Sequence, residues 1–168
     1  LPLVFFNYRG YGNSKGKPME KNFVADARAI YKWVAEQPWC DRNQISVIGR
    51  SLGTGVAMQL AASTPVHKLV LFTPYDSLIS IAKKKVPLAP VSLLLRSKFK
   101  SNEWAANVRN PTFVLLAEND EVVPHDSSLR LMQNFAVKPL VATVKGTDHV
   151  SLPHDTDAQG LVSHFLTT

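Results

Sequence analysis

Short apolar runs alternate with amphipathic segments along the whole chain, and this alternation limits the possible folds more than any other feature. The runs lie at residues 3–6, 45–48, 68–72, 112–116 and 140–144 and are rich in β-branched and aromatic side chains, which predicts strands. Helical spacing of apolar residues predicts helices over residues 22–37, 51–63, 125–135 and 156–166. Continuous apolar strands separated by helices predict an α/β fold, in which a mostly parallel sheet has helices on both faces.

The chain is long enough for one domain, which we expect to span residues 1–168. The interval between the third and fourth predicted strands, residues 76–108, is longer than one crossover helix requires. It contains an apolar stretch broken by prolines at residues 86–95. We interpret residues 76–108 as a lid-like insertion, because insertions at this edge of a sheet often cover a pocket.

The net charge of +6 comes from one local patch. Residues 81–100 contain six basic residues and no acidic one, namely Lys83, Lys84, Lys85, Arg96, Lys98 and Lys100. The rest of the chain is neutral, so nucleic-acid binding is not predicted. A solvated basic helix surface is the favoured interpretation. The alternative is a weak contact of Lys83, Lys84 and Lys85 with an anionic membrane surface or an acidic substrate.

Cofactor and metal chemistry are not predicted for this chain. The single cysteine, Cys40, excludes an internal disulfide framework and a multi-cysteine metal site. No His/Cys cluster has the spacing of metal ligands, and the chain has no dinucleotide-binding fingerprint. We therefore expect no cofactor and no metal.

The sequence Gly-Arg-Ser-Leu-Gly at residues 49–53 directly follows a predicted strand and begins a predicted helix. This is the Gly-x-Ser-x-Gly pattern in the strand–turn–helix setting that it requires. Glycines at Gly49 and Gly53 let the strand and helix pack closely, so that Ser51 is held out at the sheet edge. The amide of Leu52, at the helix N-terminus, is predicted to point toward developing negative charge.

Two further side chains follow strands at the places where a serine hydrolase needs them. Asp120 comes just after the fourth predicted strand, and His149 comes just after the fifth. The carboxyl ends of parallel strands meet at one sheet edge, so Ser51, Asp120 and His149 are expected to meet there. Asp76, after the third strand, is a rival acid, although capping of a helix that starts near Ser77 is the favoured interpretation.

These motifs, in this order, resemble those of the α/β-hydrolases, and most closely the branch of serine aminopeptidases and acyl-protein thioesterases. Residues 7–14 (Asn-Tyr-Arg-Gly-Tyr-Gly-Asn-Ser) resemble the loop after that branch's fourth strand. Residues 49–55 resemble its elbow, and residues 118–124 and 146–149 resemble its acid and histidine loops. The resemblance implies that Ser51 is the nucleophile, His149 the general base and Asp120 the carboxylate that orients it. It also implies that the Leu52 amide is one oxyanion donor.

The chain departs from that family at its beginning. α/β-Hydrolases normally begin with three more strands, and the third carries a loop that donates the second oxyanion amide. The chain starts with Leu rather than Met, so we expect it to begin inside a longer protein. The missing strands could belong to another polypeptide or to a longer parent protein. In the third alternative, the strand at residues 3–6 shifts to pair with the strand at residues 45–48.

The resulting functional prediction is a serine hydrolase that cleaves carboxylic esters or thioesters through an acyl-enzyme. Its expected partner is a small-molecule or lipid-like acyl ester. Two alternatives stay open: a non-catalytic binding domain that lacks the oxyanion loop, and a serine aminopeptidase. A cytoplasmic location is favoured, with membrane association as the alternative if an anchor precedes the chain.

Overall fold

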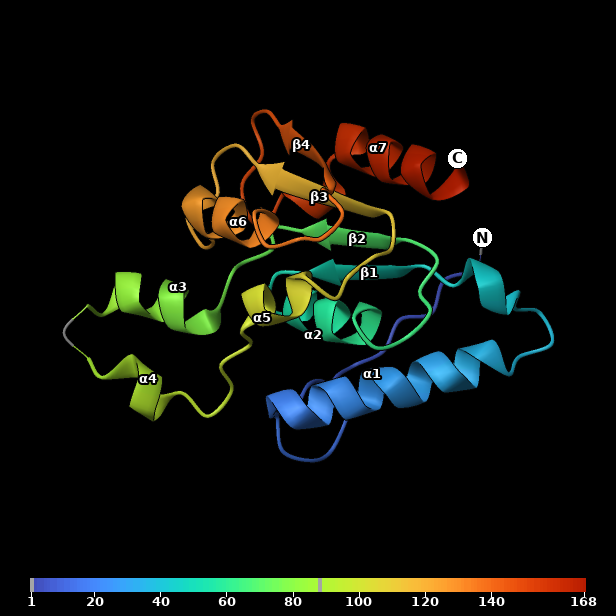
Figure 1. Ribbon diagram of the computed structural model, residues 1–168, viewed down its shortest axis with the longest axis horizontal. Helices are drawn as coiled ribbons and strands as arrows, with labels where there is room; N and C mark the ends of the chain where they lie inside the picture. Colours follow the sequence, from blue (N-terminus) through green and yellow to red (C-terminus); the bar gives the residue numbers. More distant parts are fainter. Residues whose placement is uncertain (1, 88) are drawn as a thin grey trace.

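A parallel four-stranded sheet forms the centre of the molecule, and the α/β prediction is confirmed. The computed structural model describes residues 2–87 and 89–168. The strands β1 (Val47–Arg50), β2 (Leu69–Phe72), β3 (Thr112–Ala117) and β4 (Leu140–Val144) lie in the order β1-β2-β3-β4. Every neighbouring pair is parallel, so the carboxyl ends of all four strands lie at one edge of the sheet (Figure 1).

Helices cover both faces of this sheet (Figure 1). They are α1 (Glu20–Ala35), α2 (Leu52–Ala61), α3 (Leu78–Lys85), α4 (Val91–Leu94), α5 (Ser101–Ala105), α6 (His125–Met132) and α7 (Thr156–Thr167), with short 3-10 turns at Arg42–Gln44 and Leu152–His154. The predicted helices at residues 22–37, 51–63, 125–135 and 156–166 are all present, with ends that differ by a few residues.

The central strands alternate between the two faces, residue by residue. Leu71 and Val114 belong to the apolar cluster under α2, α5 and α6, whereas Val70 and Leu115 belong to the cluster under α7. All four side chains are fully buried. Each contributes about 1.5–3 kcal/mol through its burial, so β2 and β3 form the most stable part of the sheet.

The predicted strand at residues 3–6 is not a strand in the structure, which corrects the sequence analysis. These residues have no sheet partner, and Phe5 is 88% exposed. The alternative in which they pair beside residues 45–48 is also wrong, because no strand of the described chain pairs with the outer edge of β1. Ile48 on that edge is 47% exposed. An apolar run becomes a strand only where a neighbour accepts its backbone hydrogen bonds, and residues 3–6 have no such neighbour.

The loop that follows, residues 7–14, is nevertheless well anchored. Arg9 forms an ion pair with Asp26 of α1, and Gly10 turns the chain with a φ of 86°. The ring of Tyr8 packs on Phe23 of α1, with 4.8 Å between the ring centroids. Through this aromatic contact α1 holds the loop next to the N-terminal end of α2.

The segment predicted to be an insertion, residues 76–108, contains α3, α4 and α5. The helix α5 packs against α2 and α6, whereas α3 and α4 stand out from the sheet at the edge where the strands end (Figure 1). Within the described residues, no helix is both long and apolar enough to cross a bilayer.

Gly55 of α2 provides a test of how closely α2 packs against Tyr75 and Phe99. A Cβ there would lie 2.6 Å from the Tyr75 hydroxyl oxygen and 2.7 Å from a ring carbon of Phe99. Gly55→Ala is therefore expected to lower the free energy of unfolding by about 1–3 kcal/mol, measured by urea denaturation.

Gly160 of α7 is the matched control, because a Cβ there meets no atom within 4 Å. Gly160→Ala should raise the free energy of unfolding by about 0.5–1 kcal/mol through helix propensity. Equal effects at the two positions would contradict the packing described here.

Candidate active site

Ser51 lies at a sharp turn between β1 and α2. Its backbone has φ 48° and ψ −120°, a conformation that costs a residue other than glycine about 1–3 kcal/mol. The turn is possible because Gly49 has no side chain. A Cβ on Gly49 would lie 2.9 Å from the Thr54 Cα atom and 2.8 Å from the Ala57 Cβ atom. The strain presents the Ser51 hydroxyl at the carboxyl edge of the sheet.

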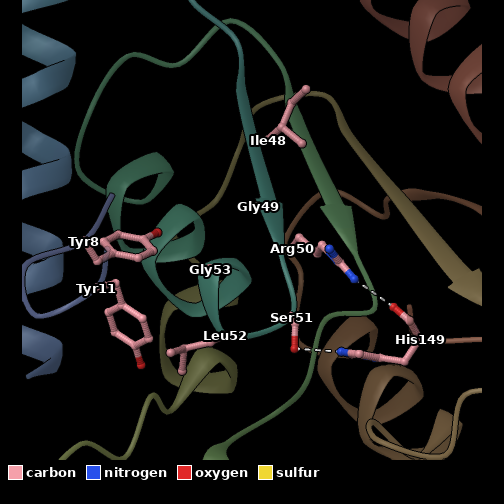
Figure 2. Close-up of a pocket in the computed structure, with 9 residues that line it drawn as sticks. All are labelled: Tyr8, Tyr11, Ile48, Gly49, Arg50, Ser51, Leu52, Gly53 and His149. Carbon is pink, nitrogen blue, oxygen red and sulfur yellow. Dashed lines mark hydrogen bonds between the residues drawn. The ribbon is translucent and has the colours of Figure 1, made fainter. Parts of the chain in front are cut away.

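The structure brings the three predicted catalytic residues together in one hydrogen-bonded chain. The His149 Nε2 atom lies 2.9 Å from the Ser51 Oγ atom (Figure 2). The His149 Nδ1 atom lies 2.9 Å from one carboxylate oxygen of Asp120 and 3.1 Å from the other. With Nδ1 donating to Asp120, Nε2 is left as the acceptor of the Ser51 proton.

The Asp120 carboxylate is held in place by hydrogen bonds that do not involve the imidazole. One of its oxygens accepts hydrogen bonds from the amides of Val122 and Val123, at 2.9 Å and 2.8 Å. Its side chain is only 2% exposed, and that of His149 is 12% exposed. A buried carboxylate held by two amides keeps its orientation, so the imidazole ring is oriented in turn.

The predicted oxyanion donor, the Leu52 amide, belongs to the first residue of α2. An N–H in the first turn of a helix has no acceptor within that helix, and it carries the partial positive charge of the helix N-terminus. The geometry of the turn thus provides one donor directly beside Ser51. The second elbow glycine, Gly53, lies under Tyr8, since a Cβ there would be 3.5 Å from the Tyr8 hydroxyl oxygen.

A hollow of about 500 Å³ opens beside Ser51. Figure 2 shows that its two sides differ: Tyr8 and Tyr11 lie on one side of Ser51, and Arg50 and His149 on the other. Burial raises the pKa of Tyr8 to about 12, so its hydroxyl is neutral at physiological pH. One side of the hollow is therefore aromatic and uncharged, and the other carries a guanidinium.

The sequence analysis did not single out Arg50, which occupies the variable position before the serine. Its guanidinium donates to the His149 carbonyl oxygen at 3.2 Å and to the Val150 carbonyl oxygen at 3.5 Å (Figure 2). Arg50 thereby links the elbow to the histidine loop. The only sequence signal was its place in the motif, two residues from Ile48 and on the same side of the strand.

Asp76, the rival acid, points to other partners. Its carboxylate accepts hydrogen bonds from the Ser77 amide and the hydroxyls of Ser80 and Ser127, and it pairs with Arg130. Burial acts to raise the pKa of Asp76, but these hydrogen bonds outweigh burial and leave the pKa below its usual value. The helix cap is Ser77, whose side chain accepts from the Ser80 amide, so the prediction that Asp76 caps the helix was wrong by one residue.

The described residues contain no group of three or more His, Cys, Asp or Glu side chains that could hold a metal ion. One other histidine near the site has a specific partner. The His125 Nε2 atom lies 2.6 Å from the carbonyl oxygen of Ala117 at the end of β3. That contact fixes the start of α6 and leaves His125 outside the chain of hydrogen bonds at Ser51.

Comparison with known proteins decides the family. Residues 2–86, just over half of the chain, match the family model described as X-Pro dipeptidyl-peptidase (S15 family). The chain belongs to the α/β-hydrolase superfamily. This α/β-hydrolase carries the S15-family domain over its first half, and the sequence resemblance is confirmed at the level of the superfamily.

Two relatives illustrate the sequence similarity. The hydrolase is 36% identical over 149 residues to the uncharacterized protein Rv2307c of Mycobacterium tuberculosis (strain ATCC 25618 / H37Rv), covering 89% of this chain and 53% of the relative. It is 30% identical over 151 residues to the lysophosphatidylserine lipase ABHD12 of Danio rerio, covering 77% of this chain and 38% of that protein. The chain therefore spans about half the length of the first relative and less of the second.

The fold is also that of solved α/β-hydrolases. The crystal structure of the α/β-hydrolase GrgF from Penicillium sp. sh18 matches with a TM-score of 0.74 and 16% identity. That match covers 96% of this chain and 77% of GrgF. At this identity the similarity supports the fold of the hydrolase and nothing about its substrate.

Asp76→Asn is expected to lower the free energy of unfolding by about 2–3 kcal/mol at pH 7, because an amide cannot replace all the acceptor positions that the carboxylate fills. The native pKa of Asp76 is depressed, so its contribution is present above the ordinary pKa and is lost as the pH falls through the native value. The wild-type chain should therefore lose stability below about pH 5 more steeply than the variant.

Urea denaturation between pH 3 and pH 7, followed by circular dichroism, measures this difference. Glu36→Gln is the control, since Glu36 is exposed and its substitution should change stability by less than about 0.5 kcal/mol. A pH dependence that is identical for the wild type and Asp76→Asn would exclude the structural role given to Asp76.

Proposed function

We propose that this α/β-hydrolase cleaves carboxylic esters of lipid-like acyl groups through a covalent acyl-enzyme on Ser51. The observation that carries the proposal is the hydrogen-bonded chain from Ser51 through His149 to Asp120, with Ser51 on a strained elbow. In this arrangement a serine hydroxyl, an imidazole base and an orienting carboxylate lie at hydrogen-bonding distances, as a serine nucleophile requires.

In the proposed first step, the Ser51 hydroxyl transfers its proton to His149 Nε2 as its oxygen attacks the acyl carbon of the ester. The carbonyl oxygen becomes a tetrahedral oxyanion, which the Leu52 amide stabilises with a hydrogen bond and with the positive end of α2. Asp120 stabilises the imidazolium that forms and keeps its Nε2–H directed at the reacting atoms.

The tetrahedral intermediate then collapses. His149 gives its proton to the leaving alkoxide, and the alcohol departs, leaving the acyl group on the Ser51 Oγ atom. A water molecule enters, loses a proton to the same Nε2 atom and attacks the acyl carbon. Return of that proton to Ser51 releases the carboxylic acid and restores the site.

The shape of the hollow supports an apolar acyl group. Its aromatic side, with Tyr8 and Tyr11, provides uncharged surface next to Ser51. A relative named as a lysophosphatidylserine lipase supports a lipid ester as the substrate class. The hollow is open to solvent, so we propose no particular chain length.

An aminopeptidase is less well supported. Such an enzyme needs a carboxylate to bind the α-amine of its substrate, and no Asp or Glu is among the described residues that line the hollow. The charged side chain there is Arg50, which would repel a protonated amine. Thioesters fit the same chemistry as esters, and a substrate panel separates the two.

A second oxyanion donor completes the proposed site. In the α/β-hydrolase pattern it comes from a strand that precedes residue 3. Loss of one donor lowers the rate by a factor of about 10²–10³. We therefore propose that a longer form of the protein is the efficient enzyme, and that this chain holds its nucleophile, base and acid.

The first test is labelling with a fluorophosphonate probe, which reacts with activated serines. The longer form should be labelled strongly and the 168-residue chain more slowly. Ser51→Ala should not be labelled at all, because the probe reacts with the Ser51 oxygen. Ser163→Ala, which removes an exposed serine on α7, is the control and should be labelled like the wild type. Absence of labelling in both the chain and its longer form would favour the non-catalytic binding domain.

The second test separates the two carboxylates. Asp120→Asn is expected to lower kcat for a short-chain ester by about 10⁴-fold, because the amide fixes the wrong imidazole tautomer. Asp76→Asn should leave kcat within a few-fold at a temperature where it remains folded. If Asp120→Asn kept its activity while Asp76→Asn lost it, the acid assignment proposed here would be reversed.

A further inference from the structure

The insertion is anchored at both of its ends, and the segment between the anchors projects from the body. At its start the Asp76 carboxylate accepts from the Ser127 hydroxyl of α6 at 2.6 Å and from the Arg130 guanidinium at 2.8 Å. At its end the Glu20 carboxylate of α1 accepts from the amides of Lys98 and Phe99, at 2.9 Å and 3.0 Å. The described residues between these anchors, 77–87 and 89–98, are here named the arm. Figure 1 shows α3 and α4, its two helices, standing clear of the sheet.

The helix α4 of the arm exposes two leucines. Leu93 is 84% exposed and Leu94 is 68% exposed, although Val91 of the same short helix α4 is buried. The helix is thus held from one side while its leucines face outward. Large aliphatic side chains so exposed on an anchored element commonly mark a contact with another apolar phase.

Basic residues flank these leucines on both sides in the sequence. Residues 81–100 contain no acidic residue, and among the described residues Lys84 pairs with Asp126 of α6 and Lys100 with Glu103. Four further cations of this stretch have no ion pair within the described part of the chain: Lys83, Lys85, Arg96 and Lys98. An apolar tip with a cationic border complements a surface that is anionic outside and apolar inside.

We propose that the arm docks onto an anionic phospholipid bilayer, with its two exposed leucines entering the interface and its cations facing the headgroups. Leu93 and Leu94 lie in a single helical turn, and the flanking stretch carries cations and no acidic residue, which favours an anionic bilayer over a protein partner. The arm follows the carboxyl end of β2, and Ser51 follows the carboxyl end of β1, so docking brings the bilayer to the sheet edge that holds the hollow.

The test measures binding without turnover, so it is independent of the proposed hydrolase activity. The full chain carrying Ser51→Ala is sedimented with vesicles of phosphatidylcholine alone or with 30% phosphatidylserine. Binding should require the anionic lipid and should fall steeply between 50 mM and 500 mM NaCl. Each cation near the surface contributes about fivefold, so Lys83→Gln with Lys85→Gln should weaken binding about 10–30-fold.

The leucines are tested by Leu93→Ser with Leu94→Ser, which should weaken binding about tenfold or more. Two matched controls remove similar groups elsewhere on the surface: Leu129→Ser with Val137→Ser, and Lys138→Gln with Lys145→Gln. Both should bind within about twofold of the parent.

A fluorophore on Leu93→Cys in a Cys40→Ser background provides a direct readout. Its emission should shift to the blue with anionic vesicles, whereas the same label on Val137→Cys should not shift. The proposal is wrong if vesicles of both compositions leave the protein in solution, or if the leucine and lysine variants bind as well as the controls. Absence of vesicle binding would favour an acidic protein surface as the partner of the arm.

Discussion

The close contact between β1 and α2 around Gly49 is the constraint on which the site depends. Any side chain at Gly49 would collide with Thr54 and Ala57, so only glycine lets the strand turn directly into the helix. The sharpness of that turn forces Ser51 into a positive φ, and the same turn starts α2 at the Leu52 amide. The proposed nucleophile and the proposed oxyanion donor are therefore placed by one backbone feature.

Two carboxylates at the carboxyl edge of the sheet have different roles because they have different partners. Asp120 is held by two amides and faces an imidazole, so in the proposed reaction it would balance the charge that forms on His149. Asp76 is surrounded by hydroxyls and a guanidinium, and it joins the insertion to α6. The parallel sheet brings both to one edge, and local hydrogen bonds separate the structural group from the one at the candidate site.

Much of the fold and the site could be predicted from the sequence, because buried strands and the elbow are specified by local patterns. The failures have physical causes. Residues 3–6 have the composition of a strand, but strand formation needs a neighbour that no local pattern reveals. In α6, Leu129 is among the apolar residues at helical spacing, yet Leu129 is exposed and the buried positions include Ser127 and Ser128. Their hydroxyls donate to Asp76 and to the Pro74 carbonyl oxygen. Polar residues therefore lie on the buried face of α6, although their hydropathy predicts an exposed face.

The open outer edge of β1 has a consequence for the behaviour of the chain in solution. A strand with one unpaired row of amides and carbonyls is a template for another strand, and the exposed apolar residues 3–6 are suited to that pairing. A strand that pairs along this edge would approach the hollow beside Ser51 from the side of Ile48, so the segment that occupies the edge would also set how far the hollow opens to solvent.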